Sequence, residues 1–418
     1  MTRLKKNIFS LFILQGSNYL IPLIIFPYLV RVLGPAEYGR IGLATSIIQY
    51  FCLFIDFGFN LTASKAIAVS SKTKEEISAI FFKTMLAKLF LLLLSIGLIF
   101  FLSCKVEQFH SINSLLHILC FQLVGAMLLP VWFFQGVEKM SSVTISYILA
   151  RGLSIPLTFI FVQEQNDINI AALIQGGATF VAGMISIYFV YKTNCITLKF
   201  RLRISEVFDT LIKSSPIFIG SIAMSLYTMS NPFILGMVSQ VEQVGIYVAA
   251  DKLRQALMGA FLILGGALYP RVNALFKESR EIGFSFVKKI ILIQGGLALI
   301  ASIMFYICSK YISNFMLGKD FEEAIIILKL MSPMIILIVL SVILCNYVLL
   351  PLGHNKLYAK LPIVTGLLHL SYAIPLSSLY GASGASLSIL ITEILTFIML
   401  LIITFKKGYL KEIWNSYE

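Results

Sequence analysis

Apolar runs of about twenty residues recur from one end of this 418-residue chain to the other, separated only by short polar segments. About twenty apolar residues carry a helix across the hydrocarbon core of a bilayer, because each residue advances the helix by about 1.5 Å. Hydrophobic residues make up 58% of the chain and charged residues 13%, which leaves no segment with the polar surface of a soluble domain. The sequence therefore predicts an all-α polytopic membrane protein. We expect twelve transmembrane helices, beginning near residues 8, 41, 78, 114, 141, 169, 214, 244, 285, 322, 357 and 382.

The basic residues are distributed unevenly between the two sides of these predicted spans. Of the 33 Lys and Arg residues, 23 flank the spans on one side, 5 flank them on the other, and 5 lie inside spans. Because basic flanks mark the cytoplasmic side of a membrane protein, both termini are predicted to be cytoplasmic. The same topology explains the net charge of +13, so we expect contacts with anionic membrane lipids and no nucleic-acid partner.

A weak internal repeat divides the chain. The segments "FPYLVRVLGPAEYGRIGLAT" (26–45) and "NPFILGMVSQVEQVGIYVAA" (231–250) align at an offset of 205, which pairs Pro27 with Pro232 and Glu37 with Glu242. The offset is close to half the chain length, and six helices per copy would give both copies the same orientation. We predict two pseudo-symmetric six-helix bundles, residues 1–205 and 206–418, around a central cavity.

Eight charged residues fall inside the predicted spans, and basic ones are in excess. A charge near the bilayer centre costs about 2.5–3.5 kcal/mol even on a lenient insertion scale, so these side chains should face a wet interior or one another. One interpretation is a cationic cavity for an anionic substrate, since the planar guanidinium of Arg can bind two phosphate oxygens at once. The candidate substrate-binding residues are Lys88, Arg151, Lys252, Arg254 and Lys329.

A structural interpretation of the same charges stays open. Asp251 and Arg254 are three residues apart on one helix and can neutralise each other. Lys88 and Arg151 have no acid within four positions, and for them the alternative is a partner on another helix, such as Asp56 or Glu393.

Four polar residues are candidates for binding a coupling ion, H⁺ or Na⁺. Asp56 and Asn60 are four residues apart and would share a helix face, and Asp251 and Glu393 are the remaining acids within spans. Helix–helix hydrogen bonding is the alternative role for Asp56 and Asn60. His117 and His369 are isolated in the sequence, and we interpret both as packing residues.

Several functions are disfavoured by what the sequence lacks. No GxxxxGK[ST] segment is present, so ATP binding by a P-loop is excluded, and there is no D-x-D, H-E-x-x-H or large polar loop to hold a catalytic site. The six cysteines form no CxxC pair, so we expect neither a metal centre nor a disulfide framework. An enzyme is therefore not expected.

Three segments resemble the Wzx-type oligosaccharide flippases, the polysaccharide transporter branch of the MOP superfamily. They are "FPYLVRVLGPAEYGRIGLATSIIQYFCLFIDFGFNLTASKAIA" (26–68), "LLPVWFFQGVEKM" (128–140) and "PLGHNK" (351–356). The resemblance implies a bacterial inner-membrane protein that moves undecaprenyl-pyrophosphate-linked oligosaccharide repeat units, of the O-antigen type, from the cytoplasmic to the periplasmic leaflet by alternating access. It implies a V-shaped bundle with a cationic central cavity, and polysaccharide polymerase or chain-length proteins as partners.

Two other functions compete with the flippase. The related multidrug or cation antiporters share twelve helices, but their cavities should favour acids over the basic excess found here. A non-transporting scaffold of the polysaccharide assembly machinery would not need uncompensated Arg and Lys within the spans.

Overall fold

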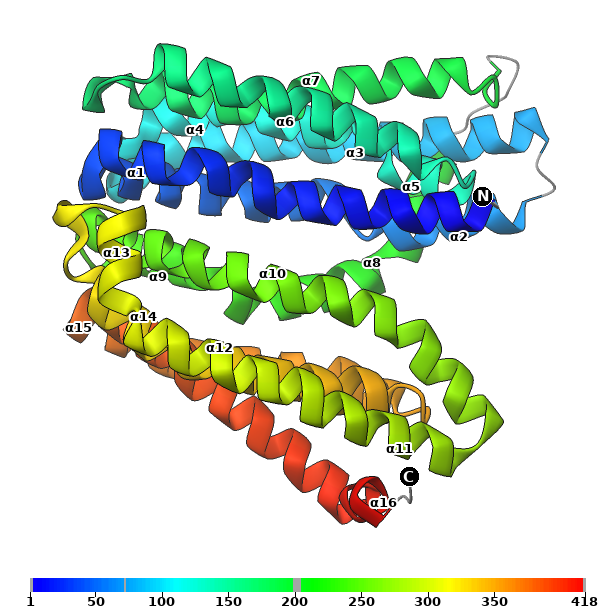
Figure 1. Cartoon of the computed structure of the whole chain (residues 1–418). Coiled ribbons are helices and arrows are strands. Elements are labelled where there is room, and N and C mark those ends of the chain that lie inside the picture. Colours follow the sequence, from blue (N-terminus) through cyan, green and yellow to red (C-terminus); the bar gives the residue numbers. More distant parts are fainter. Residues whose placement is uncertain (1–2, 71–72, 198–203, 416–418) are drawn as a thin grey trace. The chain divides into compact units, whose positions relative to one another are not determined.

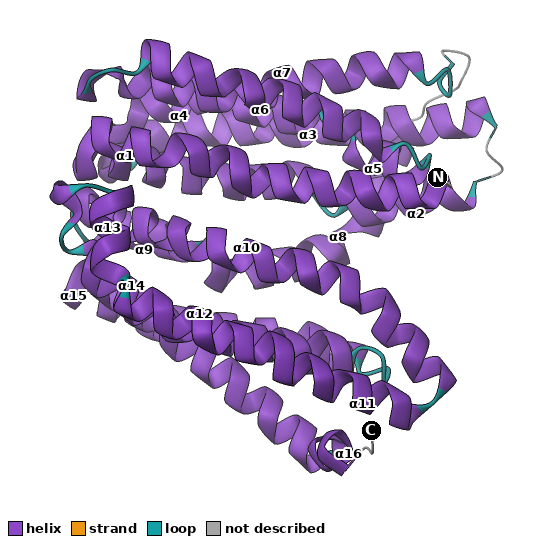
Figure 2. Cartoon of the chain, viewed as in Figure 1, coloured by secondary structure: helices purple, strands orange, loops and turns teal. Residues whose placement is uncertain are grey.

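The computed structural model describes residues 3–70, 73–197 and 204–415, and over this part of the chain the regular structure is entirely helical (Figures 1 and 2). The helices fall into two compact units, Met1–Ile222 and Ala223–Glu418. The predicted class, an all-α polytopic membrane protein, is confirmed.

The first unit is built from α1 (Arg3–Asp56), α2 (Phe59–Val69), α3 (Lys74–Lys105), α4 (Asn113–Leu128), α5 (Val131–Gly136), α6 (Met140–Phe161), α7 (Ile168–Lys192) and most of α8 (Ile204–Thr228). The second unit holds α9 (Ser230–Val238), α10 (Val241–Glu278), α11 (Arg280–Ile290), α12 (Gly296–Ile307), α13 (Ser309–Met316), α14 (Ala324–Val342), α15 (Asn355–Lys406) and α16 (Tyr409–Asn415). Short π-helical segments, Ile291–Gly295 and Ile343–Leu349, continue α11 into α12 and extend α14. The six-helix bundles with a boundary at 205/206 remain a sequence prediction, and α8 runs across the boundary between the two units.

Ten helical segments of the described chain are long and apolar enough to span a membrane. Two of them, Ile21–Val69 with 49 residues and Asn355–Lys406 with 52, are long enough for two crossings each, since a core of about 30 Å takes about twenty residues. Each contains a backbone break: Gly34 has φ 71° and ψ 174°, and Gly381 has φ 55° and ψ −133°, values that favour glycine. The count of twelve crossings remains a prediction, and both breaks fall where it places a connection.

The repeat noted in the sequence has a structural counterpart in these breaks. Gly34 interrupts α1 just before Pro35, a residue suited to the first turn of a new helix. At the position 205 residues later, Ser239 has an extended backbone (φ −139°, ψ −179°) and separates α9 from α10. Both copies of the repeat thus carry a helix break at the aligned residue.

The first unit is held together by close helix–helix contacts. α4 packs along α7, and α1 lies against α6 and α4. A side-chain carbon at Gly125 of α4 would lie 2.5 Å from the backbone carbon of Thr179 of α7, so a glycine is needed for this approach.

A second interruption in the first unit corrects one sequence inference. α1 ends at Asp56, Phe57 (φ 42°) and Gly58 (φ 78°) form a turn, and α2 begins at Phe59. The expectation that Asp56 and Asn60 share one helix face is therefore wrong, because the helix does not continue between them. The turn is covered by α8, since a side-chain carbon at Gly58 would lie 2.7 Å from Ile217, and Phe57 stacks on Phe218 with ring centroids 4.3 Å apart.

In the second unit, α15 is the central element and packs against α14, α9 and α10. Gln243 of α10 stabilises the break at Gly381 of α15. It accepts a hydrogen bond from the Ala382 backbone N–H (2.9 Å) and donates one to Glu323 (2.8 Å). The C-terminal helix α16 docks on α11, where Arg280 forms two hydrogen bonds to Glu412 at 2.7 and 2.8 Å.

Candidate functional site

Lys88, predicted as a substrate-binding residue, is fully buried in the first unit. Its Nζ lies 3.0 Å from Asp56 Oδ1 and donates a second hydrogen bond, 2.7 Å long, to the carbonyl oxygen of Ala126 in α4. Its side chain has 0% exposure, whereas the Asp56 side chain is 41% exposed. The inter-helix partner considered in the sequence is therefore the one observed. In this structure Lys88 has no surface with which to contact a substrate, and Asp56 presents the accessible charge of the pair.

Arg151 lies halfway along α6 and is half-buried. Its guanidinium carbon lies 5.1 Å from the centre of the Tyr147 ring, one turn earlier on the same helix, which is a cation–π contact. Neighbouring side chains form a small apolar cluster of Leu129, Ala150 and Ala182, with Tyr147 packed against it. Tyr147 thus contacts both the Arg151 charge and this apolar cluster.

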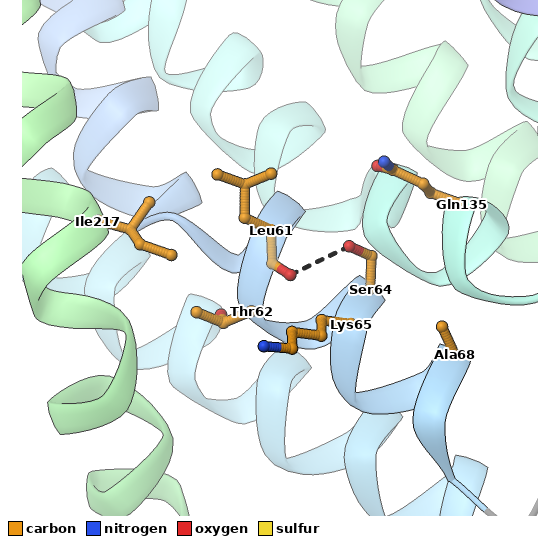
Figure 3. Close-up of a pocket in the computed structure, with 7 residues that line it drawn as sticks. All are labelled: Leu61, Thr62, Ser64, Lys65, Ala68, Gln135 and Ile217. Atoms are coloured by element: carbon orange, nitrogen blue, oxygen red, sulfur yellow. Dashed lines mark hydrogen bonds between the residues drawn. The ribbon is translucent and has the colours of Figure 1, made fainter. Parts of the chain in front are cut away.

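A pocket of about 590 Å³ opens beside the turn that follows α1 (Figure 3). Part of its lining is polar: the Lys65 ammonium, the Gln135 amide and the hydroxyls of Thr62 and Ser64. The rest of the lining is apolar. The lining residues are Leu61, Thr62, Ser64, Lys65 and Ala68 of α2, Gln135 of α5 and Ile217 of α8.

Hydrogen bonds hold the walls of this pocket. Thr62 Oγ1 and Ser214 Oγ lie 2.7 Å apart and join α2 to α8, and Ser64 Oγ donates back to the carbonyls of Asn60 and Leu61. Lys65 is exposed, and Asn60 is half-buried next to the pocket wall. A volume of this size suits a small molecule or the headgroup of a lipid. In the sequence, Lys65 is one of the 23 basic residues on the side predicted to be cytoplasmic, and a single Lys near a helix end does not indicate a pocket.

Asp251, Lys252 and Arg254 lie close together on α10 in the second unit. Arg254 donates from both Nε (2.8 Å) and Nη2 (2.6 Å) to Asp251 Oδ1, and Gln255 donates to Asp251 Oδ2 at 2.6 Å. Asp251 and Arg254 are both 8% exposed, so the pair is buried. The neutralising interpretation is therefore the arrangement observed, and Arg254 Nη1 takes no part in the pair. Lys252, on the same turn, is half-buried.

Glu393 and Lys329 differ in their surroundings. Glu393 of α15 is buried at 8% exposure and lies within electrostatic reach of Arg254. Lys329 is exposed and is only the sixth residue of α14, with its Nζ 5.6 Å from the ring centre of Tyr306 near the end of α12. This position near two helix ends is typical of a lysine that extends its ammonium toward the membrane surface.

A buried polar network around His369 was missed by the sequence reasoning. His369 is 0% exposed and hydrogen-bonds to Asn231 of α9 and Thr392 of α15. Its partners lie 138 and 23 residues away, so nothing in the local sequence distinguishes it from a packing histidine. Within the described ranges, no three His, Cys, Asp or Glu side chains gather in a way that could hold a metal ion.

Long apolar helices with buried charges inside them define a polytopic membrane protein. An inward-facing multidrug resistance MATE family transporter of the MOP superfamily superposes with a TM-score of 0.74 at 15% identity, covering 96% of both chains. The lipid II flippase MurJ, in an inward closed conformation, superposes with a TM-score of 0.75 at 15% identity, covering 97% of this chain and 90% of its own. These likenesses establish the fold.

The family follows from sequence comparison. The model of the polysaccharide biosynthesis protein family matches residues 4–276, and the chain belongs to this family. A protein of Escherichia coli K12 named "Putative O-antigen transporter" is 34% identical over 96% of both chains. A protein of Shigella dysenteriae with the same name is 32% identical over 95% of this chain and 99% of its own. The capsular polysaccharide biosynthesis protein CapF of Staphylococcus aureus is 22% identical over 94% of this chain.

Proposed function

We propose that the protein is a flippase that moves undecaprenyl-pyrophosphate-linked oligosaccharide repeat units from the cytoplasmic to the periplasmic leaflet of the bacterial inner membrane. The observation that carries the proposal is the near full-length similarity, at 32–34% identity, to two proteins named as O-antigen transporters. The fold of transporters and flippases and the family match support it. Under this proposal both termini are cytoplasmic and the protein is a transporter, not an enzyme.

The pocket beside α2 suits the reducing end of such a substrate. A pyrophosphate carries negative charge and needs cationic and N–H donors, which Lys65 and Gln135 supply. The polyprenyl chain needs an apolar surface continuous with lipid, and Leu61 and Ile217 line the same opening. The proposed role of this pocket is to receive the headgroup at the cytoplasmic side, where the distribution of basic residues predicts Lys65 to lie.

Arg151 and Arg254 are proposed to attract the pyrophosphate farther into the membrane. Arg254 is held by Asp251 through Nε and Nη2, which fixes the guanidinium and leaves Nη1 outside the pair. Lys252 lies beside it, and Lys329 would act near the membrane surface. Lys88 is proposed to hold Asp56 in place at the end of α1, since its own ammonium is buried.

Turnover is proposed to be coupled to an ion gradient, H⁺ or Na⁺, with Asp56, Asn60, Asp251 and Glu393 as the candidate residues from the sequence. Polysaccharide polymerase and chain-length proteins are the expected partners. The multidrug antiporter alternative rests on fold alone, because the MATE similarity is at 15% identity.

Complementation tests the proposal. The chain is expressed in a strain that lacks its own O-unit flippase and makes a compatible lipid-linked unit, and the polymer ladder on surface lipopolysaccharide is scored. Lys65→Ala, Arg151→Ala, Arg254→Ala and Arg254→Lys are run beside wild type at matched membrane levels. Lys74→Ala, an exposed lysine of α3 outside the pocket, is the matched control.

We expect wild type and Lys74→Ala to restore the ladder and the alanine variants of the three basic site residues to reduce it. Partial activity of Arg254→Lys would mean that charge matters more than the two-point geometry of Arg. A ladder unaffected by all the site variants would refute the proposed site and keep the flippase. Failure of wild type with several sugar compositions, followed by no translocation in purified vesicles, would refute the flippase itself.

A further inference from the structure

The buried network around His369 connects both halves of α15 with α9 and α10. His369 lies before the break at Gly381. Its partner Thr392 lies after it, as do Ser388, which accepts from Thr392, and Ala385, which accepts from Asn231. Asn231 belongs to α9 and Tyr247 to α10. All of these side chains are buried, so each donor and acceptor must find its partner within the protein.

The hydrogen bonds of Asn231 determine where His369 carries its proton. Asn231 Nδ2 donates to the hydroxyl of Tyr247 (3.0 Å) and to the carbonyl oxygen of Ala385 (3.2 Å). Its Oδ1 is therefore an acceptor, and His369 Nε2, 3.0 Å away, must be the donor. Nε2 holds a hydrogen whether the ring is neutral or charged.

The other ring nitrogen faces a hydroxyl that can serve both protonation states. His369 Nδ1 lies 2.7 Å from Thr392 Oγ1, and Thr392 Oγ1 also lies 2.8 Å from the carbonyl oxygen of Ser388. A threonine has one hydroxyl hydrogen, so it can donate to Nδ1 or to Ser388, but not to both. Tyr372, whose hydroxyl is 2.7 Å from Thr392 Oγ1, can donate to that oxygen in either case.

With a neutral imidazole, Thr392 donates to Nδ1. With an imidazolium, Nδ1 donates to Thr392 Oγ1 and the hydroxyl turns to donate to Ser388. Rotation of one O–H bond thus satisfies every donor and acceptor in both states, with no movement of a heavier atom.

The charges near the network also fit the binding of one proton. The elements that pack on this part of α15 carry several charged and titratable groups. They are Tyr227 of α8, Tyr247, Asp251, Lys252 and Arg254 of α10, Lys329 of α14, Cys345 and Tyr347 of the π-helical segment, and Tyr358, Tyr372 and Glu393 of α15 itself. The buried charges among them are Asp251, Arg254 and Glu393, which together carry one negative charge when ionised. An imidazolium at His369 makes the buried sum neutral.

We propose that His369 is a proton-binding site of the transport cycle and that the Thr392 hydroxyl is the rotor that accommodates the proton. The ligand is a proton and not a metal cation, because the hydrogen on His369 Nε2 is directed at Asn231 Oδ1. That hydrogen bond engages the oxygen that a metal cation would need as a ligand. The link to transport rests on the proposed flippase function, whereas proton binding at His369 does not.

Proton binding is tested without substrate. The purified full-length chain in lipid nanodiscs is labelled with ¹³C,¹⁵N-histidine, and His369 is assigned as the signal absent from His369→Gln. Between pH 4 and 9 we expect its ring signals to titrate, with Nε2 protonated throughout and Nδ1 changing. Thr392→Val, which removes the rotor, is expected to lower the pH at which His369 titrates, whereas Thr365→Val, another buried threonine of α15, leaves it unchanged. A His369 that keeps one protonation state across this range in wild type, or the same midpoint in Thr392→Val, would overturn the proposal.

Coupling is tested in proteoliposomes with the lipid-linked oligosaccharide that supports complementation. We expect a transmembrane pH gradient to stimulate wild-type translocation, and His369→Gln to fall to the unstimulated rate, because Gln can replace the neutral hydrogen bonds and cannot take up a proton. His117→Gln, in the first unit, should keep the stimulation. Stimulation that survives in His369→Gln, or that follows Na⁺ and ignores pH, would refute the coupling role. Absence of any translocation by wild type would refute the flippase proposal alone, since the titration would still decide proton binding.

Discussion

Lys88 Nζ and Asp56 Oδ1 lie 3.0 Å apart and join the middle of α3 to the last residue of α1. The carboxylate sits at a helix C-terminus, where the partial negative charge of the backbone carbonyls disfavours an acid. The buried ammonium offsets this repulsion and also binds the Ala126 carbonyl of α4, so a single side chain ties three helices together at the turn before α2.

Removing the acid of this pair should destabilise the protein more than removing the base. Asp56→Asn leaves a fully buried ammonium without its counter-charge, a loss of about 3–5 kcal/mol in comparable buried pairs. Lys88→Met leaves Asp56, which water can reach, and we expect a loss of about 1–2 kcal/mol from the hydrogen bonds. Apparent melting temperatures of the purified variants in nanodiscs check the order.

The double variant Asp56→Asn with Lys88→Met is the control for this pair. It should melt above Asp56→Asn alone, because no buried charge is left unpaired. Equal melting temperatures for both single variants would show that Lys88 finds another partner when Asp56 is changed.

The Asp251–Arg254 pair should behave as a charge pair and not as two simple hydrogen bonds. Asp251→Asn keeps an acceptor oxygen beside Nε and Nη2 but leaves the buried guanidinium uncompensated, and we expect a loss of about 3 kcal/mol. Gln255→Ala removes one neutral donor to the same carboxylate, with an expected loss of about 1 kcal/mol. Thermal unfolding of both variants compares them, and a loss in Gln255→Ala as large as that in Asp251→Asn would contradict this account.

The spans and the charged residues inside them could be predicted from the sequence, because the hydropathy of a segment and the free-energy cost of a charge within the bilayer depend only on the local sequence. The predicted connections near residues 34 and 381 coincide with backbone breaks for the same reason, since each holds a glycine between apolar runs. The interruption at Phe57–Gly58 was not predicted, because the segment "FCLFIDFGFN" has the pattern of one continuous apolar helix. The turn there packs against Ile217 of α8, a contact between distant segments that the local sequence does not indicate.

Which charges meet depends on contacts between distant segments. The sequence allowed two partners for Lys88, Asp56 and Glu393, and the structure pairs it with Asp56. The pocket of Lys65 and the network of His369 need residues from three helices each, and a single sequence contains no signal that brings Gln135 to Lys65 or Asn231 to His369.

The contact between α4 and α7 predicts opposite results for two glycines. Gly125→Ala places a carbon against the Thr179 backbone, so the helices must separate, and we expect a loss of about 1–3 kcal/mol from overpacking. Gly177→Ala on α7 meets nothing within 4 Å and is the matched control, with an expected gain of about 0.5–1 kcal/mol from the better helix former. Melting temperatures of the two variants check the prediction, and similar shifts in both would show that α4 and α7 are not held at this distance.

The docking of α16 should weaken in acid because of His354, which lies between two spans. The His354 ring is 2.7 Å from the Tyr409 hydroxyl, and burial, followed by the nearby Lys407 charge, lowers the pKa of His354 from its ordinary value of about 6.5. The unfolded chain therefore binds more protons than the folded chain just below that pH, and the stabilising contribution present above about pH 6.5 is lost as the pH falls. We expect the melting temperature of wild type to drop more between pH 8 and about pH 5.5 than that of His354→Gln, which keeps a partner for Tyr409 and does not titrate. His110→Gln, at an exposed histidine of the first unit, should retain the wild-type dependence on pH, and an identical dependence in His354→Gln would exclude His354 as its source.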